Sequence, residues 1–313
     1  MEYTFHSSQW KWYELDLQDT HLFENAIKES HEYKRWIKQV EKNDNNSINM
    51  YTGTPGKENV WGSLIYQQDI EKREENATFH FYLTRKELVT ANFDLSQLDH
   101  HNAKTMKEKM HHCESPMEGF LVLLSEIIAD FLKKIDKFEV KLHTLLWEIK
   151  ENNRTKILDR AAAVDHELLV WKNLLIPIEE TQMAVEEAFG EQTAQGAQFK
   201  RATCRIERAK TLLDAYEGEI KSVLNLENLI STHRGNEITK TLTIMTTLFA
   251  PTTALGAIWG MNFKHMPELE WKFGYAFAGT LIVFSTVFLY FYLKSKGWMG
   301  DLLNTKSKKS FFK

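Results

Sequence analysis

Two long stretches without a charged side chain lie near the C-terminus of this 313-residue chain, and they constrain its fold more than any other feature. The first runs from Thr241 to Phe263 and the second from Phe273 to Leu293, which are 23 and 21 residues. About 20 apolar residues in an α-helix cross the ~30 Å hydrocarbon core of a bilayer. We therefore expect a transmembrane hairpin, with spans at 241–263 and 273–293 and an outer loop at 264–272. Two buried core helices are the alternative, but aromatic side chains surround the second stretch on every face, which suits lipid better.

The charges around the hairpin predict its orientation. The loop balances two lysines with two glutamates, whereas the tail at 294–313 carries six lysines, beginning with Lys294 and Lys296, against Asp301 alone. Basic residues stay on the cytoplasmic side of a membrane. We expect a multi-pass protein of the cell (inner or plasma) membrane, with the lipid bilayer as a partner and both termini in the cytoplasm.

The overall composition averages two unlike parts. Residues 1–240 carry 31 Lys and Arg against 40 Asp and Glu, a net charge of −9, while the last 73 residues carry +5. The total of −4 excludes a strongly basic nucleic-acid binder, and two cysteines are too few for a disulfide scaffold. We expect no nucleic-acid partner.

The part that precedes the hairpin divides into a mixed segment and a helical one. Residues 1–115 contain short alternating runs at 10–15, 60–66, 78–83 and 88–92 and a helical stretch near 22–40, which predict an α+β cytoplasmic domain with a small sheet flanked by helices. Residues 116–240 are helical, over 119–151 and 156–189 and then in a very long stalk helix from about 192 that enters the first span without a linker.

The stalk helix carries an apolar heptad repeat. Apolar residues recur every seven positions in two interleaved rows, namely Phe199, Ile206, Leu213 and Ile220, and Ala202, Ala209, Tyr216, Val223 and Ile230. Such a seam packs either against the helix's own domain or against other copies of the chain, and the sequence leaves both possibilities open.

The first span has the composition of a pore helix. Two helices cannot enclose a water-filled pore, so a channel needs several copies of this span around an axis. Small and hydroxyl-bearing residues at steps of three and four form one face that permits close helix packing or lines a polar conduit. This stripe consists of Asn236, Thr239, Thr243, Thr246, Ala250, Thr253, Ala257 and Gly260.

The motifs at the outer end of this span resemble those of the CorA family of magnesium transporters. They are Thr243–Pro251 (TIMTTLFAP), Trp259–Phe263 (WGMNF), Met266–Leu269 (MPEL) and the lysine-rich tail. The resemblance implies a pentameric funnel, a homopentamer whose first spans line the pore. It implies that Gly260, Met261 and Asn262 form the selectivity filter, and that Gly260 and Asn262 bind the ion through its hydration shell. The pore-lining positions are then Asn236, Thr239, Leu242, Thr246, Ala250, Thr253 and Ala257.

The chain departs from the family pattern at two points. Thr239 and Ala250 stand where the family has bulky methionines, so either Leu242 and the nearby Ile238 form the constriction or the constriction is wider. The family's regulatory carboxylates have no clear counterpart, because the stalk is basic around Lys200 and Arg201. Closure by cytoplasmic Mg²⁺ is therefore a hypothesis that is motivated by the net charge of −9 in residues 1–240.

The chemistry of the filter residues agrees with Mg²⁺ as the transported ion. Mg²⁺ dehydrates reluctantly, so neutral oxygens recognise it best through its water shell. Glu268 in the outer loop is expected to concentrate divalent cations by its negative field. An inside-negative potential supplies roughly 2.3 kcal/mol per charge per 100 mV, about twice that for a divalent ion. No ATPase motif occurs, and we expect neither enzymatic activity nor an organic cofactor.

Other functions stay open. His100, His101, His111 and His112 form either a solvated histidine-rich surface, which we favour, or a site for zinc or cobalt. A Zn²⁺ (or Co²⁺ or Ni²⁺) transporter of the same fold is the alternative function, and a membrane-anchored scaffold without transport is a third. The sequence does not fix ion selectivity, because recognition through a water shell leaves little side-chain identity to read.

Overall fold

The computed structural model describes residues 1–5, 10–15, 31–40, 45–72, 74–94, 96, 98, 103–151, 156–262, 264, 266–267 and 271–299. The chain forms two compact units. The first comprises residues 1–149 and 153–222, and the second comprises residues 150–152 and 223–313. One long helix, α7 (Ala197–Trp259), contributes its first part to the first unit and the remainder to the second.

A six-stranded sheet in the order β1-β2-β6-β5-β4-β3 lies in the first unit. The pairing is antiparallel except between β2 and β6, which run parallel. The strands are β1 (Glu2–Phe5), β2 (Trp10–Leu15), β3 (Ser47–Tyr51), β4 (Asn59–Gln68), β5 (Asn76–Thr84) and β6 (Glu87–Ala91).

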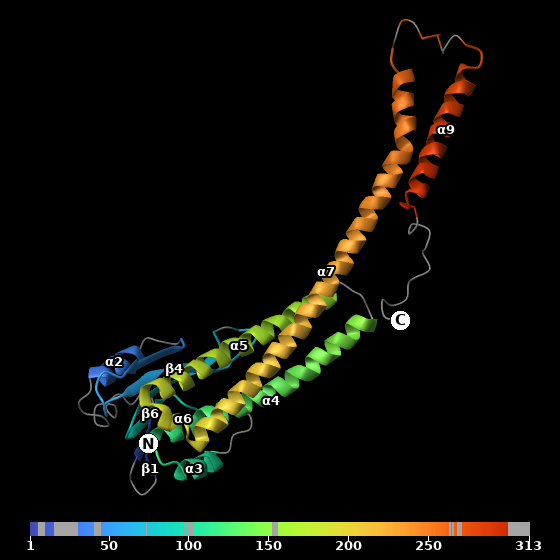
Figure 1. The fold of residues 1–313 in the computed structure, drawn as a ribbon. Helices are drawn as coiled ribbons and strands as arrows, with labels where there is room; N and C mark the ends of the chain where they lie inside the picture. The colour runs from blue at the N-terminus through green and yellow to red at the C-terminus, as the bar shows by residue number, and fades with distance from the viewer. Residues whose placement is uncertain are drawn as a thin grey trace. The chain divides into compact units, whose positions relative to one another are not determined.

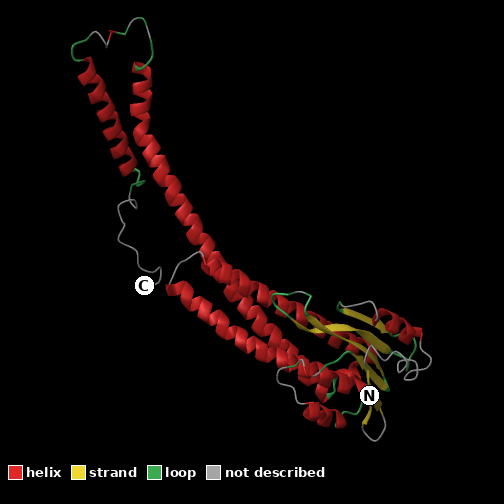
Figure 2. Cartoon of the chain, turned by 180° about the vertical axis from the view of Figure 1, so that it is seen from behind, coloured by secondary structure: helices red, strands yellow, loops and turns green. Residues whose placement is uncertain are grey.

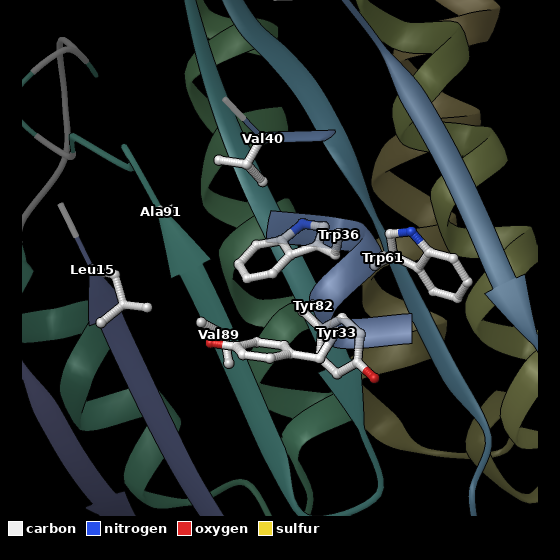
Figure 3. Packing of buried hydrophobic residues seen from close by; sticks show 8 residues of the cluster. All are labelled: Leu15, Tyr33, Trp36, Val40, Trp61, Tyr82, Val89 and Ala91. Atoms are coloured by element: carbon white, nitrogen blue, oxygen red, sulfur yellow. The ribbon is translucent and has the colours of Figure 1, made fainter. Parts of the chain in front are cut away.

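Helices pack on both faces of this sheet, because successive side chains of a strand point to opposite faces. On one face, the ring of Tyr82 lies 5.2 Å from that of Tyr33 on α2 (His31–Val40), within a buried cluster that also holds Trp36 and Trp61 (Figure 3). On the other face, the ring of the neighbouring Phe81 lies 4.7 Å from that of Phe120 on α4 (Pro116–Glu151). The sheet is therefore the middle of three layers.

Long helices form the rest of the first unit, and α4, α5 and the first part of α7 run side by side (Figure 1). Local sequence defines their ends. Pro116 opens α4, where the Ser115 hydroxyl accepts the N–H of Glu118, as is typical of a capped helix start. Gly190, with φ of 86°, follows the last residue of α5. The remaining bounds are α3 (Ala103–His111), α4 (Pro116–Glu151), α5 (Lys156–Phe189), α6 (Glu191–Ala194) and α7 (Ala197–Trp259).

The heptad repeat of α7 is buried within its own chain, which decides one of the questions that the sequence left open. Seven of its members, from Phe199 to Ile220, are at most 6% exposed in the first unit. The seam therefore closes the core of a single copy. Any contact between copies in this unit has to use other surfaces of the helices.

The second unit holds the two helices that are long and apolar enough to cross a membrane. They are α7, through its C-terminal part, and α9 (Gly274–Ser295). In both views α9 runs alongside the end of α7 (Figures 1 and 2). The α+β fold class, with a very long helix and two apolar helices toward the C-terminus, is confirmed, and the span boundaries stay a prediction.

Candidate ion pathway

The end of α7 has a covered face and an open face. Ile244 is 3% exposed, and Thr247, Leu248, Pro251, Leu255 and Trp259 are half-buried at steps of three and four along the same side. The predicted stripe lies on the other side of the helix. All of its members, from Asn236 to Gly260, are exposed in a single chain. The structure therefore leaves uncovered the residues that the sequence assigned to the pore.

The threonine hydroxyls of the stripe donate to their own helix. Thr243 donates to the carbonyl of Thr239 at 2.8 Å, and Thr246 donates to the carbonyls of Leu242 and Thr243, each at 3.0 Å. Thr253 donates in the same way to Phe249 at 3.1 Å. Because a hydroxyl has one proton and two lone pairs, each oxygen keeps its acceptor capacity. The stripe thus presents neutral oxygen acceptors without any charge.

The helix tightens and ends at the predicted filter. The N–H of Gly260 donates to the carbonyl of Gly256 at 2.9 Å, and the N–H of Met261 donates to that of Ile258 at 3.3 Å. A Cβ atom on residue 260 would lie 3.0 Å from the oxygen of Gly256, so a side chain there would crowd the turn. Asn262 follows directly and is exposed. The amide of Asn262 and the last carbonyls of α7 lie together at one end of the stripe.

Pro251 interrupts the backbone hydrogen bonds inside the span. Proline has no N–H, so the carbonyl of Thr247, four residues earlier, lacks its usual helical donor. In a hydrocarbon environment such a group must find another partner. The covered face of α7 therefore has one polar backbone group that lipid cannot satisfy.

The other predicted site residues lie beside the stripe, at the end of α9 or outside the described residues. Leu242 and Ile238 are 64% and 70% exposed on the flank of the stripe. Lys294 and Lys296 lie at the end of α9, and Lys296 Nζ is 6.0 Å from the ring centroid of Tyr292. This pairing of a cation with an aromatic ring fits a membrane interface. Glu268 lies outside the described residues.

The histidine-rich segment is described only in part. His100 and His101 lie outside the described residues, while His111 ends α3 with its ring 4.9 Å from that of Phe5 and His112 is exposed. Burial raises the pKa of the neighbouring Cys113 thiol to about 12. Among the residues that the structure describes, no group of three potential metal ligands occurs. The metal site at these histidines stays a prediction.

An uncharged, exposed line of α7 continues from the predicted stripe toward the N-terminus of the helix. Asn225, Leu229 and Thr232 continue the same steps of three and four before Asn236, and all three are exposed in the second unit. The spacing was the signal that could have found them. The uncharged face of α7 is thus longer than the membrane span.

A mixed sheet packed with long helices, followed by two helices that are long and apolar enough to cross a membrane, the first with one polar face, fits a membrane protein. The model of the family described as CorA-like Mg2+ transporter protein matches residues 7–295, so this chain belongs to the CorA family. It is 42% identical over 301 residues to the magnesium transport protein CorA of Bacillus subtilis, covering 96% of this chain and 95% of that protein.

Two further relatives show how far the similarity extends. The cobalt/magnesium transport protein CorA of Thermotoga maritima is 23% identical over 181 residues, which are 56% of this chain and 51% of that protein. The structure of the CorA magnesium transporter from Methanocaldococcus jannaschii superposes with a TM-score of 0.60 at 16% identity, covering 95% of this chain and 93% of that one. The likeness to the Methanocaldococcus jannaschii structure concerns the fold alone.

Proposed function

We propose that several copies of this chain form a channel that admits Mg²⁺, with the exposed stripe of α7 facing a common axis. The observation that carries the proposal is the open stripe itself. It is uncharged, small, and bears hydroxyl oxygens that still accept hydrogen bonds. Membership of the CorA family and the name of the Bacillus subtilis relative support Mg²⁺ as the ion. The resemblance to the family further suggests five copies.

In this proposal the ion enters with its water shell intact. The side chain of Asn262 and the carbonyl of Gly260 accept hydrogen bonds from that water at the outer end. Such contacts suit Mg²⁺, which dehydrates reluctantly, and they release it more readily than a ring of carboxylates would. The hydroxyls of Thr253, Thr246 and Thr243 then offer further acceptors along the stripe.

The direction of transport follows from the proposed topology. With the lysines at 294 and 296 on the cytoplasmic side, the outer loop with Glu268 faces the exterior and the membrane potential drives cations inward. Residues 1–240 carry −9 per copy, which attracts Mg²⁺ to the inner mouth. We propose that this accumulation favours closure, with Leu242 as the constriction. Flux that does not fall as internal Mg²⁺ rises would contradict the gating.

Reconstitution into liposomes tests the function. Vesicles that contain the full chain and a Mg²⁺-sensitive dye should take up Mg²⁺ when an inside-negative potential is imposed. Asn262→Ala should abolish most of this uptake. Asn76→Ala, the same change at an exposed position of the first unit, is the matched control and should leave uptake unchanged. Protein that assembles but gives no flux of any metal would identify a membrane-anchored scaffold instead.

The same vesicles decide the ion. Uptake is measured in parallel for Mg²⁺, Zn²⁺, Co²⁺ and Ni²⁺ at equal concentration, each with its own indicator. We expect the vesicles to take up Mg²⁺ when it is the only divalent metal present. Zn²⁺ flux that exceeds Mg²⁺ flux, and that Asn262→Ala removes, would replace the proposed ion while keeping the pathway.

A further inference from the structure

One line of the α5 surface is open although the helix is otherwise packed into the first unit. Its members are exposed and alternate at steps of four and three residues. Three of them are large and apolar, spaced seven apart, with exposed fractions of 47% at Leu169, 56% at Ile176 and 58% at Met183. Exposed apolar side chains in heptad register are typical of a helix that packs against another helix. The whole line is Ala162, His166, Leu169, Asn173, Ile176, Glu180, Met183 and Glu187.

The first part of α7 has an open line of the opposite character. Cys204, Thr211 and Gly218 are exposed and also lie seven residues apart. A Cβ atom on Gly218 would meet nothing within 4 Å, and the Thr211 hydroxyl donates to the carbonyl of Glu207 at 2.8 Å. The line therefore has small side chains at the spacing where α5 has large ones.

Contacts within one chain show which residues of the antiparallel helices α5 and α7 lie at the same height along the helix axes. Among the described residues, side-chain pairs that join α5 to α7 are Lys172 with Asp214 at 2.8 Å and with Glu217 at 2.6 Å, Glu179 with Lys210 at 2.7 Å, and Gln182 with Thr203. These pairs place Met183 level with Cys204, Ile176 with Thr211, and Leu169 with Gly218. Each large side chain thus lies at the height of a small one.

Charged side chains flank the two lines at the same heights along the helix axes. By the same pairs, Glu180 lies level with Arg208, and Glu187 lies level with Arg201. All four are exposed. Within the part of the chain that the structure describes, none of the four takes part in an ion pair. Glu207, next to Arg208 and also exposed, lies at the height of Glu180 as well, so the charges are opposite at Glu187 and mixed at Glu180. The two surfaces are therefore complementary in size along their length and in charge at the Glu187 end.

We propose that the open α5 line of one copy packs against the open α7 line of the next copy in a ring. The inference rests on the proposed function in one respect, because it needs several copies around an axis along α7. In such a ring each contact joins two different surfaces, the α5 line of one copy and the α7 line of the next. Every copy therefore contributes both surfaces, one to each neighbour. Leu169, Ile176 and Met183 insert between the small residues of the neighbour's α7, and the glutamates pair with its arginines.

The native Cys204 allows a direct test by disulfide cross-linking. Two differently tagged full-length chains are co-expressed in membranes, one with Met183→Cys and Cys204→Ser and the other unaltered. Oxidation with copper phenanthroline should give a product that carries both tags, while each chain alone gives none. Cys113 is buried and does not interfere. Val140→Cys with Cys204→Ser, exposed on α4, is the control and should give about tenfold less product, because a disulfide requires Cβ atoms ~4 Å apart.

A second set of variants tests the ring and the charges. Chains with Met183→Cys and native Cys204 should yield a ladder of products larger than a dimer. Glu180→Arg and Arg208→Glu should each reduce the mixed-tag product, and the two changes together should restore it. Absent cross-links, or dimers only, in protein that still assembles and transports Mg²⁺ would overturn this interface and leave the proposed function standing. Unaltered chains that neither assemble nor transport Mg²⁺ would refute both the interface and the proposed function.

Discussion

Replacing single hydroxyls on α7 would show whether the open stripe carries the ion. Thr246 lies on the stripe, whereas Thr247 is half-buried on the covered side. Valine has the shape of threonine and the same branching at Cβ, so Thr246→Val removes an oxygen and leaves the volume and backbone preference nearly unchanged. Thr247→Val is the same change one residue along the same helix, which makes it a matched control.

The expected magnitude follows from the hydrogen bonds of Thr246. Its proton is used by the carbonyls of Leu242 and Thr243, so the oxygen contributes to transport only as an acceptor for water around the ion. Because the partner is a water molecule, the bond joins neutral groups and contributes about 0.5–1.5 kcal/mol, and each 1.36 kcal/mol changes a rate about tenfold. Every copy around the axis loses the same contact, so the loss at the rate-limiting position should slow Mg²⁺ uptake by about tenfold.

The assay is Mg²⁺ uptake into liposomes, normalised to the amount of protein inserted, with size-exclusion chromatography to confirm assembly. Thr246→Val should lower uptake while Thr247→Val leaves it within about twofold of the unaltered protein, since surface-type changes away from a site shift free energies by less than about 0.5 kcal/mol. Equal losses in the two variants, or a loss at Thr247 alone, would refute the assignment of the stripe to the pore.

Three further predictions concern stability. Leu213→Ala, at a fully buried position of α7, should destabilise the first unit by about 3 kcal/mol, as measured by chemical unfolding; a change below about 1 kcal/mol would contradict its core role. Gly62→Ala places a Cβ atom 2.0 Å from a backbone oxygen of β3, so thermal unfolding should occur at clearly lower temperature, and an unchanged midpoint would mean that β3 is not paired there. The ammonium groups of Lys172 and, to a smaller extent, Lys221 lower the pKa of Glu217 to about 2, so the stabilisation from these pairs is complete above about pH 4.5 and lost as pH falls toward 2. The stability difference between the unaltered protein and Lys172→Met should shrink across that range, and a constant difference would exclude the pair.

The membrane hairpin and most of the fold could be predicted from sequence because their patterns are local. The β2 strand at 10–15 and the α5 helix at 156–189 agree with the predicted bounds. The strands β1 and β3 were not predicted. They are only four and five residues long, lie at the edges of the sheet, and all five residues of β3 are half-buried, so no alternation marks them.

The candidate site was predicted in part. Steps of three and four residues identified the stripe, because that spacing defines a helix face whatever the helix packs against. The spacing could not show which face is covered, since that depends on where α9 and the rest of the chain lie. For the same reason the heptad of α7 could not be assigned to its own unit or to another copy until the burial of Leu213 and its neighbours was known.

The burial of that heptad has a consequence for how the protein is made. Because Phe199, Ile206 and Leu213 complete a core within one chain, a newly synthesised copy has no need of a partner to finish folding. The open stripe of α7 is small and polar, and lipid gives little drive for such surfaces to meet. Folding should therefore be first order and independent of protein density, whereas assembly should be slower at low density in the membrane. Biogenesis then has two separable stages, with a completed monomer as the intermediate.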